Sequence, residues 1–276
     1  MFGKKPQPVA LQPPWTGVVS ALPAEAKCFR LKRLGPMTTH RLTSTSRLSL
    51  SGIGDARAAH AAVEHLAAGA GALASWGIAG GLDPALKPGD VLLPERVIFG
   101  GESYATDPVW RERIAGFLKP HFPIDERPLL HSQTPLLRVD QKREAWEATG
   151  ASAVDMESGA VARIASLHKV PFICLRAVAD PASRALPKSA LAAASPEGGL
   201  RPIRLLASLT IRPWEIGALR ALSRDLKAAQ LGLFAAWIWA EEDLFAPPQS
   251  HAGGDLTVSA DEVRTPPDLR DADSGD

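Results

Sequence analysis

An almost unbroken apolar run that ends on an acid constrains the fold of this chain most strongly. The run covers residues 172–178 (FICLRAV), and Asp180 follows two positions later. Such a run predicts a strand covered on both faces, as in the sheet of an α/β protein. Open α/β sheets bind ligands beyond the carboxyl ends of their strands, so Asp180 is a candidate site residue. Met156 and Glu157 stand at the start of the preceding predicted helix, so the Glu157 and Asp180 carboxylates can meet over one pocket.

Predicted strands and helices alternate along the chain. The strands are expected at 16–21, 48–51, 70–75 and 90–99, and the helices at 22–34, 56–68, 108–119 and 139–149. This alternation predicts a single α/β domain of three layers (αβα), in which helices flank a central mixed sheet.

Composition along the chain predicts where this domain begins and ends. Its expected parts are a flexible N-terminus (1–15), the α/β domain (16–245) with a loop and Arg/Leu-rich insertion (182–214) and one long final helix (215–245), and a disordered acidic tail (246–276). The N-terminus lacks the apolar core of a signal peptide, and the longest apolar run (231–240) is too short to cross a bilayer. We therefore expect a cytoplasmic protein.

Charge and residue counts argue against several classes of site. A net charge of +1 gives no general reason to expect nucleic acid as a partner. The chain has only two cysteines, Cys28 and Cys174, and its seven histidines are scattered, so no disulfide framework or metal site is predicted. No Walker loop or nucleophile elbow is present either, and no cofactor is expected.

Two glycine-rich turns follow predicted strands. Gly54 ends the GIG turn before a helix, and Gly77 opens the segment GIAGGL, which also contains Ile78 and Ala79. Glycines there can bring backbone N–H groups to an anion or a sugar hydroxyl, although many such turns need glycine for geometry only. Both turns are candidate substrate-binding elements.

Glu25 adds a third carboxylate to Glu157 and Asp180. It lies in the first turn of the predicted helix 22–34, where it could equally complement the helix dipole. Three carboxylates without a metal suit a reaction through a sugar cation. One acid protonates the leaving base, another activates the attacking water, and a third holds a ribose hydroxyl.

Five segments, in order, resemble the nucleoside phosphorylase and nucleosidase family, and most closely the methylthioadenosine/S-adenosylhomocysteine nucleosidases. They are GIG, GIAGGL, LKPGDVLLPE, VDMESGAVA and VPFICLRAVAD, and the likeness covers about residues 16–181. The resemblance implies that Asp180 protonates the purine at N7, Glu157 binds ribose hydroxyls, Met156 packs against the sugar and Glu25 activates water. It also implies a homo-oligomer.

Three departures from the family pattern bear on the positioning of Asp180 and on the nucleophile. Ile78 replaces a small hydroxyl residue, and Ala179 replaces the serine before the acid. The arginines that hold phosphate in the phosphorylases have no clear match, although Arg57 is a candidate. Their loss favours hydrolysis, with inorganic phosphate left open as a co-substrate.

The segment LPKSALAAASPEGG and the Arg/Leu-rich stretch after it resemble the hopanoid-associated branch of the family. That resemblance implies cleavage of adenosylhopane to adenine and ribosylhopane or its phosphate, with peripheral contact to the inner face of the membrane. One alternative is a soluble methylthioadenosine/S-adenosylhomocysteine nucleosidase acting on a small-molecule nucleoside. Another is a nucleoside-binding protein without catalytic activity.

Overall fold

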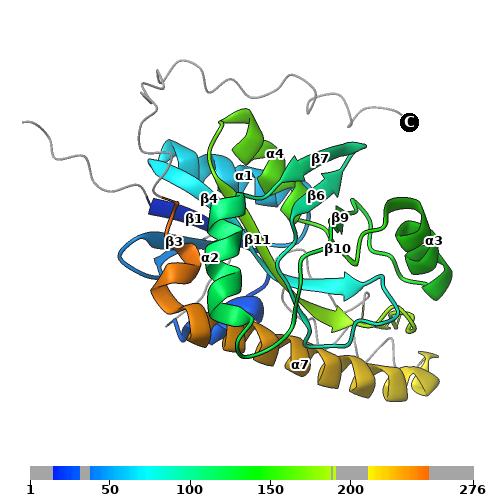
Figure 1. Ribbon diagram of the computed structural model, residues 1–276. Coiled ribbons are helices and arrows are strands. Elements are labelled where there is room, and N and C mark those ends of the chain that lie inside the picture. Colours follow the sequence, from blue (N-terminus) through cyan, green and yellow to red (C-terminus); the bar gives the residue numbers. More distant parts are fainter. Residues whose placement is uncertain (1–14, 32–37, 188, 191–210, 249–276) are drawn as a thin grey trace, which may run out of the picture.

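The chain folds around one mixed β-sheet with helices on both faces (Figure 1). The computed structural model describes residues 15–31, 38–187, 189–190 and 211–248. Within these ranges eleven strands belong to the sheet. The prediction of a single α/β domain with a central mixed sheet is confirmed.

The long strand β4 (Ala70–Gly81) is the centre of the sheet. It pairs in parallel with β1 (Trp15–Ser20) on one side and with β11 (Phe172–Asp180) on the other. Its last residues also pair antiparallel with β10 (Ala153–Asp155). Every residue of β11 is buried, as the apolar run predicts. The carboxyl ends of β4 and β11 and the short strand β10 therefore lie close together.

The remaining strands extend the sheet outward. Beyond β1 lie β3 (Ser46–Leu50) and β2 (Thr39–Arg41); beyond β10 lie β9 (Leu129–His131), β6 (Arg96–Phe99) and β7 (Glu102–Ala105); and beyond β11 lie β5 (Val91–Leu92) and β8 (Ile124–Asp125).

Helices cover the sheet from both sides and make two hydrophobic cores. On one face α1 (Asp55–Ala67) packs beside α4 (Ser158–Leu167), and on the other α7 (Ile216–Ala240) crosses β11 with α2 (Pro108–Leu118) beside it (Figure 1). The helix α3 (Val139–Thr149) contributes Trp146 to a third, minor hydrophobic cluster around Leu82, Ala151 and Val154.

The helix predicted at 22–34 is wrong. In residues 22–31 the chain forms only a short 3-10 helix, η1 (Glu25–Phe29), which ends where Arg30 adopts a left-handed φ of 52°, and residues 32–34 lie outside the described residues. The Glu25 side chain accepts hydrogen bonds from the residues just before it, so the chain folds tightly around that carboxylate.

The final helix is shorter than predicted. The α-helix α7 ends at Ala240 because Glu241 has a left-handed φ of 41°, and 3-10 helices η2 (Pro213–Glu215) and η3 (Glu241–Phe245) flank it. The first described strand, β1, begins at Trp15, one residue before the predicted strand. The predicted N-terminal segment up to residue 14, the tail from 249 and most of the insertion (191–210) lie outside the described residues.

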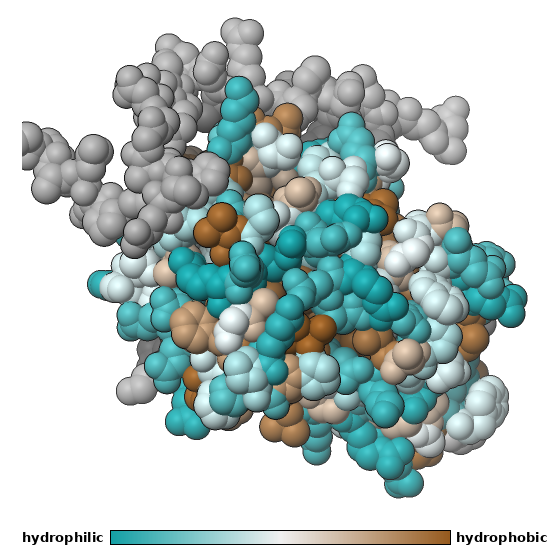
Figure 2. Space-filling model, in the orientation of Figure 1, coloured by the Kyte–Doolittle hydropathy of each residue, from teal (hydrophilic) through white to brown (hydrophobic). Residues whose placement is uncertain are grey.

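The outer surface is mixed in character. Hydrophilic side chains separate small hydrophobic patches on the face that Figure 2 shows. None of the described helices has both the length and the apolar character needed to span a membrane.

Candidate active site

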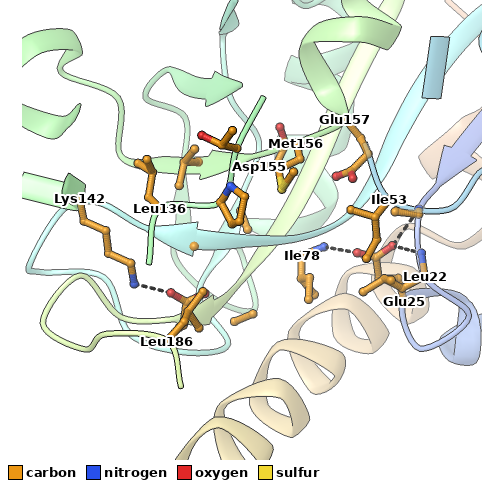
Figure 3. Close-up of a pocket in the computed structure, with 18 residues that line it drawn as sticks. Leu22, Glu25, Ile53, Ile78, Leu136, Lys142, Asp155, Met156, Glu157 and Leu186 are labelled. Atoms are coloured by element: carbon orange, nitrogen blue, oxygen red, sulfur yellow. Dashed lines mark hydrogen bonds and ion pairs between the residues drawn. The ribbon is translucent and has the colours of Figure 1, made fainter. Parts of the chain in front are cut away.

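A cavity of about 270 Å³ opens at the carboxyl ends of the central strands (Figure 3). Residues from β4, β10, β11, α3 and the loop 134–136 line it. Six of the predicted site residues are among them: Glu25, Ile78, Ala79, Met156, Glu157 and Asp180. Glu25 and Glu157 lie toward one end of the cavity, and Lys142, which holds Asp180, lies toward the other (Figure 3).

Hydrogen bonds fix the Glu25 carboxylate at one end of the cavity. Its Oε2 accepts from Ser20 Oγ at 2.8 Å and from the backbone N–H groups of Ala21 and Leu22 at 3.0 and 2.8 Å. Its Oε1 accepts from the N–H of Ile78 at 3.0 Å. Burial raises the pKa of Glu25, although the Arg176 charge and these donors act against the rise. Oε1 accepts a single bond from the described residues, so it retains a lone pair for a ligand or water.

Glu157 stands just before α4 and shares that end of the cavity. Its Oε1 accepts a hydrogen bond from the N–H of Gly54 at 2.8 Å. Burial, and then the negative charge of Asp155, raises the pKa of Glu157. An acid that faces a cavity with only one oxygen engaged can accept hydrogen bonds from a ligand's hydroxyl groups.

Asp180 ends β11, as predicted, and lies at the other end of the cavity. It forms a buried ion pair with Lys142, whose ammonium also donates to the backbone oxygens of Pro181 and Arg184 at 3.0 Å each. Burial raises the pKa of Asp180 although Lys142 acts to lower it. A raised pKa keeps more of this carboxyl protonated, as a proton donor requires.

Gly54 and Gly77 are not among the residues that line the cavity, although the sequence predicts both as substrate-binding. The N–H of Gly54 is directed to Glu157, and its φ of 105° suits glycine. A Cβ on Gly77 would lie 2.6 Å from Oε1 of Glu25. Both glycines therefore position the carboxylates.

A buried ion pair at the wall of the cavity, between Arg176 and Asp155, was not predicted from the sequence. The Arg176 guanidinium donates from Nε to Asp155 Oδ2 at 2.7 Å, and from Nη2 to Ser75 Oγ and Ser158 Oγ at 2.7 and 2.8 Å. Asp155 belongs to the VDME motif and Arg176 to the RAVAD motif, and these motifs are the sequence signal from which the pair could have been found. Lys142 carried no such signal.

The character of the cavity limits its chemistry. Its walls include the apolar side chains of Ile53, Leu136 and Leu186. Lys142 is the one cationic side chain among the described residues that line it. No group of three or more potential metal ligands occurs within the described ranges.

A family model described as "Phosphorylase superfamily" matches residues 16–199, which is most of the chain. The chain belongs to the phosphorylase superfamily. Membership of this superfamily confirms the expectation of an enzyme of the nucleosidase and phosphorylase class. No curated protein sequence matches the chain significantly.

Solved structures share the fold of this superfamily member. A methylthioadenosine/S-adenosylhomocysteine nucleosidase from Neisseria meningitidis, in complex with methylthio-immucillin-A, superposes with a TM-score of 0.60 at 19% identity, over 80% of this chain and 95% of that one. A putative nucleosidase of the same kind from Francisella philomiragia gives a TM-score of 0.58 at 17% identity, over 82% and 98%. Futalosine hydrolase of Helicobacter pylori gives 0.53 at 18% identity, over 61% and 88%.

Proposed function

We propose that the chain hydrolyses the N-glycosidic bond of a purine nucleoside and releases the base. The observation that carries this proposal is the separation of the carboxylates within one cavity. Glu25 and Glu157 share one end, and Lys142, the ion-pair partner of Asp180, stands at the other (Figure 3). A nucleoside fits this arrangement, because its sugar hydroxyls need hydrogen-bond acceptors and its leaving base needs a proton donor.

Each carboxylate then has a separate role. Asp180 protonates the purine at N7, so the base leaves as a neutral molecule with the electrons of the C1′–N9 bond. Glu157 accepts hydrogen bonds from the ribose hydroxyls, and Met156 packs against the sugar. Glu25 takes a proton from water as the water oxygen attacks C1′. A pair of acids of this kind stabilises an oxocarbenium-like transition state.

Water is the proposed nucleophile. A phosphate dianion needs cationic or N–H partners near C1′. Within the described residues the only cation lining the cavity is Lys142, and its ammonium is engaged by Asp180 and two carbonyl oxygens. Ile78 supplies an apolar side chain where the family pattern has a hydroxyl.

The proposed substrate is adenosylhopane, a nucleoside with a lipid on its 5′ side. The cavity, at about 270 Å³, is slightly smaller than typical ligand sites of about 300–1,000 Å³, so the lipid body would lie outside it. Leu186 lines the cavity, and three residues later Ser189 N donates to Glu215 Oε2 of η2, just before α7, at 2.9 Å. Beside that contact Ile211 and Trp214 are 68% and 73% exposed. Exposed apolar side chains there would suit a lipid or a membrane interface.

Methylthioadenosine or S-adenosylhomocysteine is the second candidate substrate. The fold shared with nucleosidases named for these compounds favours it. Such a substrate needs no lipid-binding surface, so the exposed side chains near α7 would then be ordinary surface.

Measuring adenine release by the purified protein distinguishes these two candidate substrates. The substrates are adenosylhopane in mixed micelles and methylthioadenosine in buffer, each with and without phosphate. We expect release from the lipid nucleoside, independent of phosphate, with free ribosylhopane as the second product. Release mainly from methylthioadenosine would identify the second candidate. Binding of both nucleosides without release would overturn the proposal that the chain cleaves either of them.

A further inference from the structure

A single lysine is buried beside the candidate acid. Lys142 is the only buried residue of α3, and its side chain is 1% exposed. Burying an ammonium group is costly unless its donors are satisfied. Three acceptors meet the three donors of Lys142: the Asp180 carboxylate and the backbone oxygens of Pro181 and Arg184. The chain therefore bears the cost of burying this ammonium group directly beside Asp180.

The contact restricts the Asp180 carboxyl group. Lys142 holds Oδ2, and no described residue donates a hydrogen bond to Oδ1. Gly80 on the neighbouring strand lies so close that a Cβ there would be 3.3 Å from Oδ1. With one oxygen held and the backbone of β4 alongside, Oδ1 is the oxygen available to a ligand in the cavity.

The residue before Asp180 explains why such a contact is needed. Ala179 stands where the family pattern has a serine, so no hydroxyl adjoins the acid from within β11. Lys142 reaches Asp180 from a different element, α3, and supplies a donor in its place. A lysine differs from a serine because it carries a positive charge.

We propose that Lys142 is the positioning residue for Asp180, fixing its carboxyl group and stabilising the carboxylate that forms when the proton leaves. The inference rests on the proposed function, in which Asp180 donates to the purine. In the step, the proton on Oδ1 passes to N7 of the base and the C1′–N9 bond breaks. Lys142 keeps its own protons throughout. Asp180 regains a proton from solvent after the base departs.

The surroundings of Asp180 give this proposal a pH signature. Burial raises the pKa of Asp180, the Lys142 charge and hydrogen bond lower it, Asp225 on α7 raises it, and Arg184 lowers it. Because the acid must be protonated, activity falls as pH rises through its pKa. Loss of Lys142 removes the main lowering influence, so the fall in activity moves to higher pH. Loss of a lysine that only supported the fold would not shift the pH at which activity falls.

The test compares Lys142→Met with Arg143→Met, an exposed neighbour on the same helix. Adenine release is measured against substrate concentration from pH 5 to pH 10. For Lys142→Met we expect kcat to fall about 10- to 100-fold, a part of what general-acid catalysis contributes. We also expect little change in KM and a basic limb at least one pH unit higher. Arg143→Met should match wild type in all three.

Several results would overturn the inference. Wild-type kcat and an unmoved basic limb in Lys142→Met would show that the lysine does not act on Asp180. Loss of the wild-type circular dichroism spectrum in both Lys142→Met and a second variant, Lys142→Gln, would make it a structural residue. Failure of the wild type to release adenine from any purine nucleoside would overturn the proposed function itself, and is seen before any variant is compared.

Discussion

Ionisation of Glu157 should lower the free energy of unfolding at alkaline pH, and replacement of Glu157 by glutamine should remove that effect. The carboxyl group is half-buried and faces the charge of Asp155, which together raise its pKa from 4.5 to about 8. Glutamine keeps an oxygen that can accept the hydrogen bond from Gly54 N, but it carries no charge. Glu157→Gln therefore removes the ionisation and leaves the contact.

The sign follows from the direction of the shift. Because the pKa of Glu157 in the folded state lies above the unfolded value, the folded chain holds this proton more tightly. The associated stability is complete below pH 4.5 and is lost as pH rises to about 8. Wild type should therefore lose free energy of unfolding over this window, and Glu157→Gln should not.

The magnitude can be worked from the same shift. A rise from 4.5 to about 8 corresponds to about 5 kcal/mol, at about 1.4 kcal/mol per pKa unit. About half of this loss of stability occurs between pH 6 and pH 9, and solvent in the cavity screens part of the Glu157 charge. We expect the advantage of Glu157→Gln to grow by about 2 kcal/mol from pH 6 to pH 9.

Urea denaturation followed by tryptophan fluorescence at pH 6 and pH 9 measures this difference. Glu112→Gln, an exposed position on α2, is the matched control and should follow wild type at both values. Equal pH dependence in Glu157→Gln and wild type would refute the reasoning, since it would mean that ionisation of Glu157 costs nothing in the folded state.

Two further substitutions test the supports of the site. Gly77→Ala places a Cβ 2.6 Å from Oε1 of Glu25, and we expect kcat to fall about 100-fold, as misplacement of a catalytic group by about 1 Å can cause. In the control, Gly116→Ala, the new Cβ has open space, so kcat should stay at the wild-type value. A wild-type kcat in Gly77→Ala would contradict the account. Arg176→Met leaves the buried Asp155 unpaired and should lower the free energy of unfolding in urea by about 3–5 kcal/mol. Adding Asp155→Asn should restore part of this loss, whereas additive losses would show that the two residues do not interact.

The sequence could predict features that depend on short stretches of chain. The apolar run before Asp180 indicates a buried strand, and the position of the acid at its end follows directly. The helix at 139–149 is predicted with its observed bounds, because polar and apolar residues alternate with helical spacing and Gly150 ends it in a left-handed conformation. Glu157 also lies at the helix start where the VDMES pattern places it.

Features that depend on contacts between distant residues could not be predicted in this way. Residues 22–34 have helical composition, yet the Glu25 side chain bonds to backbone groups of β4 and of its own preceding turn. Within the described residues 22–31 the predicted α-helix does not form. Lys142 lies among charged residues on α3, so nothing in its local pattern separates it from an exposed lysine. The roles of Gly54 and Gly77 also depend on which side chain each meets, and both meet carboxylates.

The measurement that tests the central claim most directly is adenine release by the wild type and Asp180→Asn, side by side, from whichever purine nucleoside the wild type cleaves. Asparagine has nearly the same shape but cannot donate the carboxyl proton to the base. The account predicts a rate about 10²- to 10⁴-fold lower, with an unchanged circular dichroism spectrum. Equal rates in the two proteins would contradict the assignment of Asp180 as the acid on which the proposed mechanism rests.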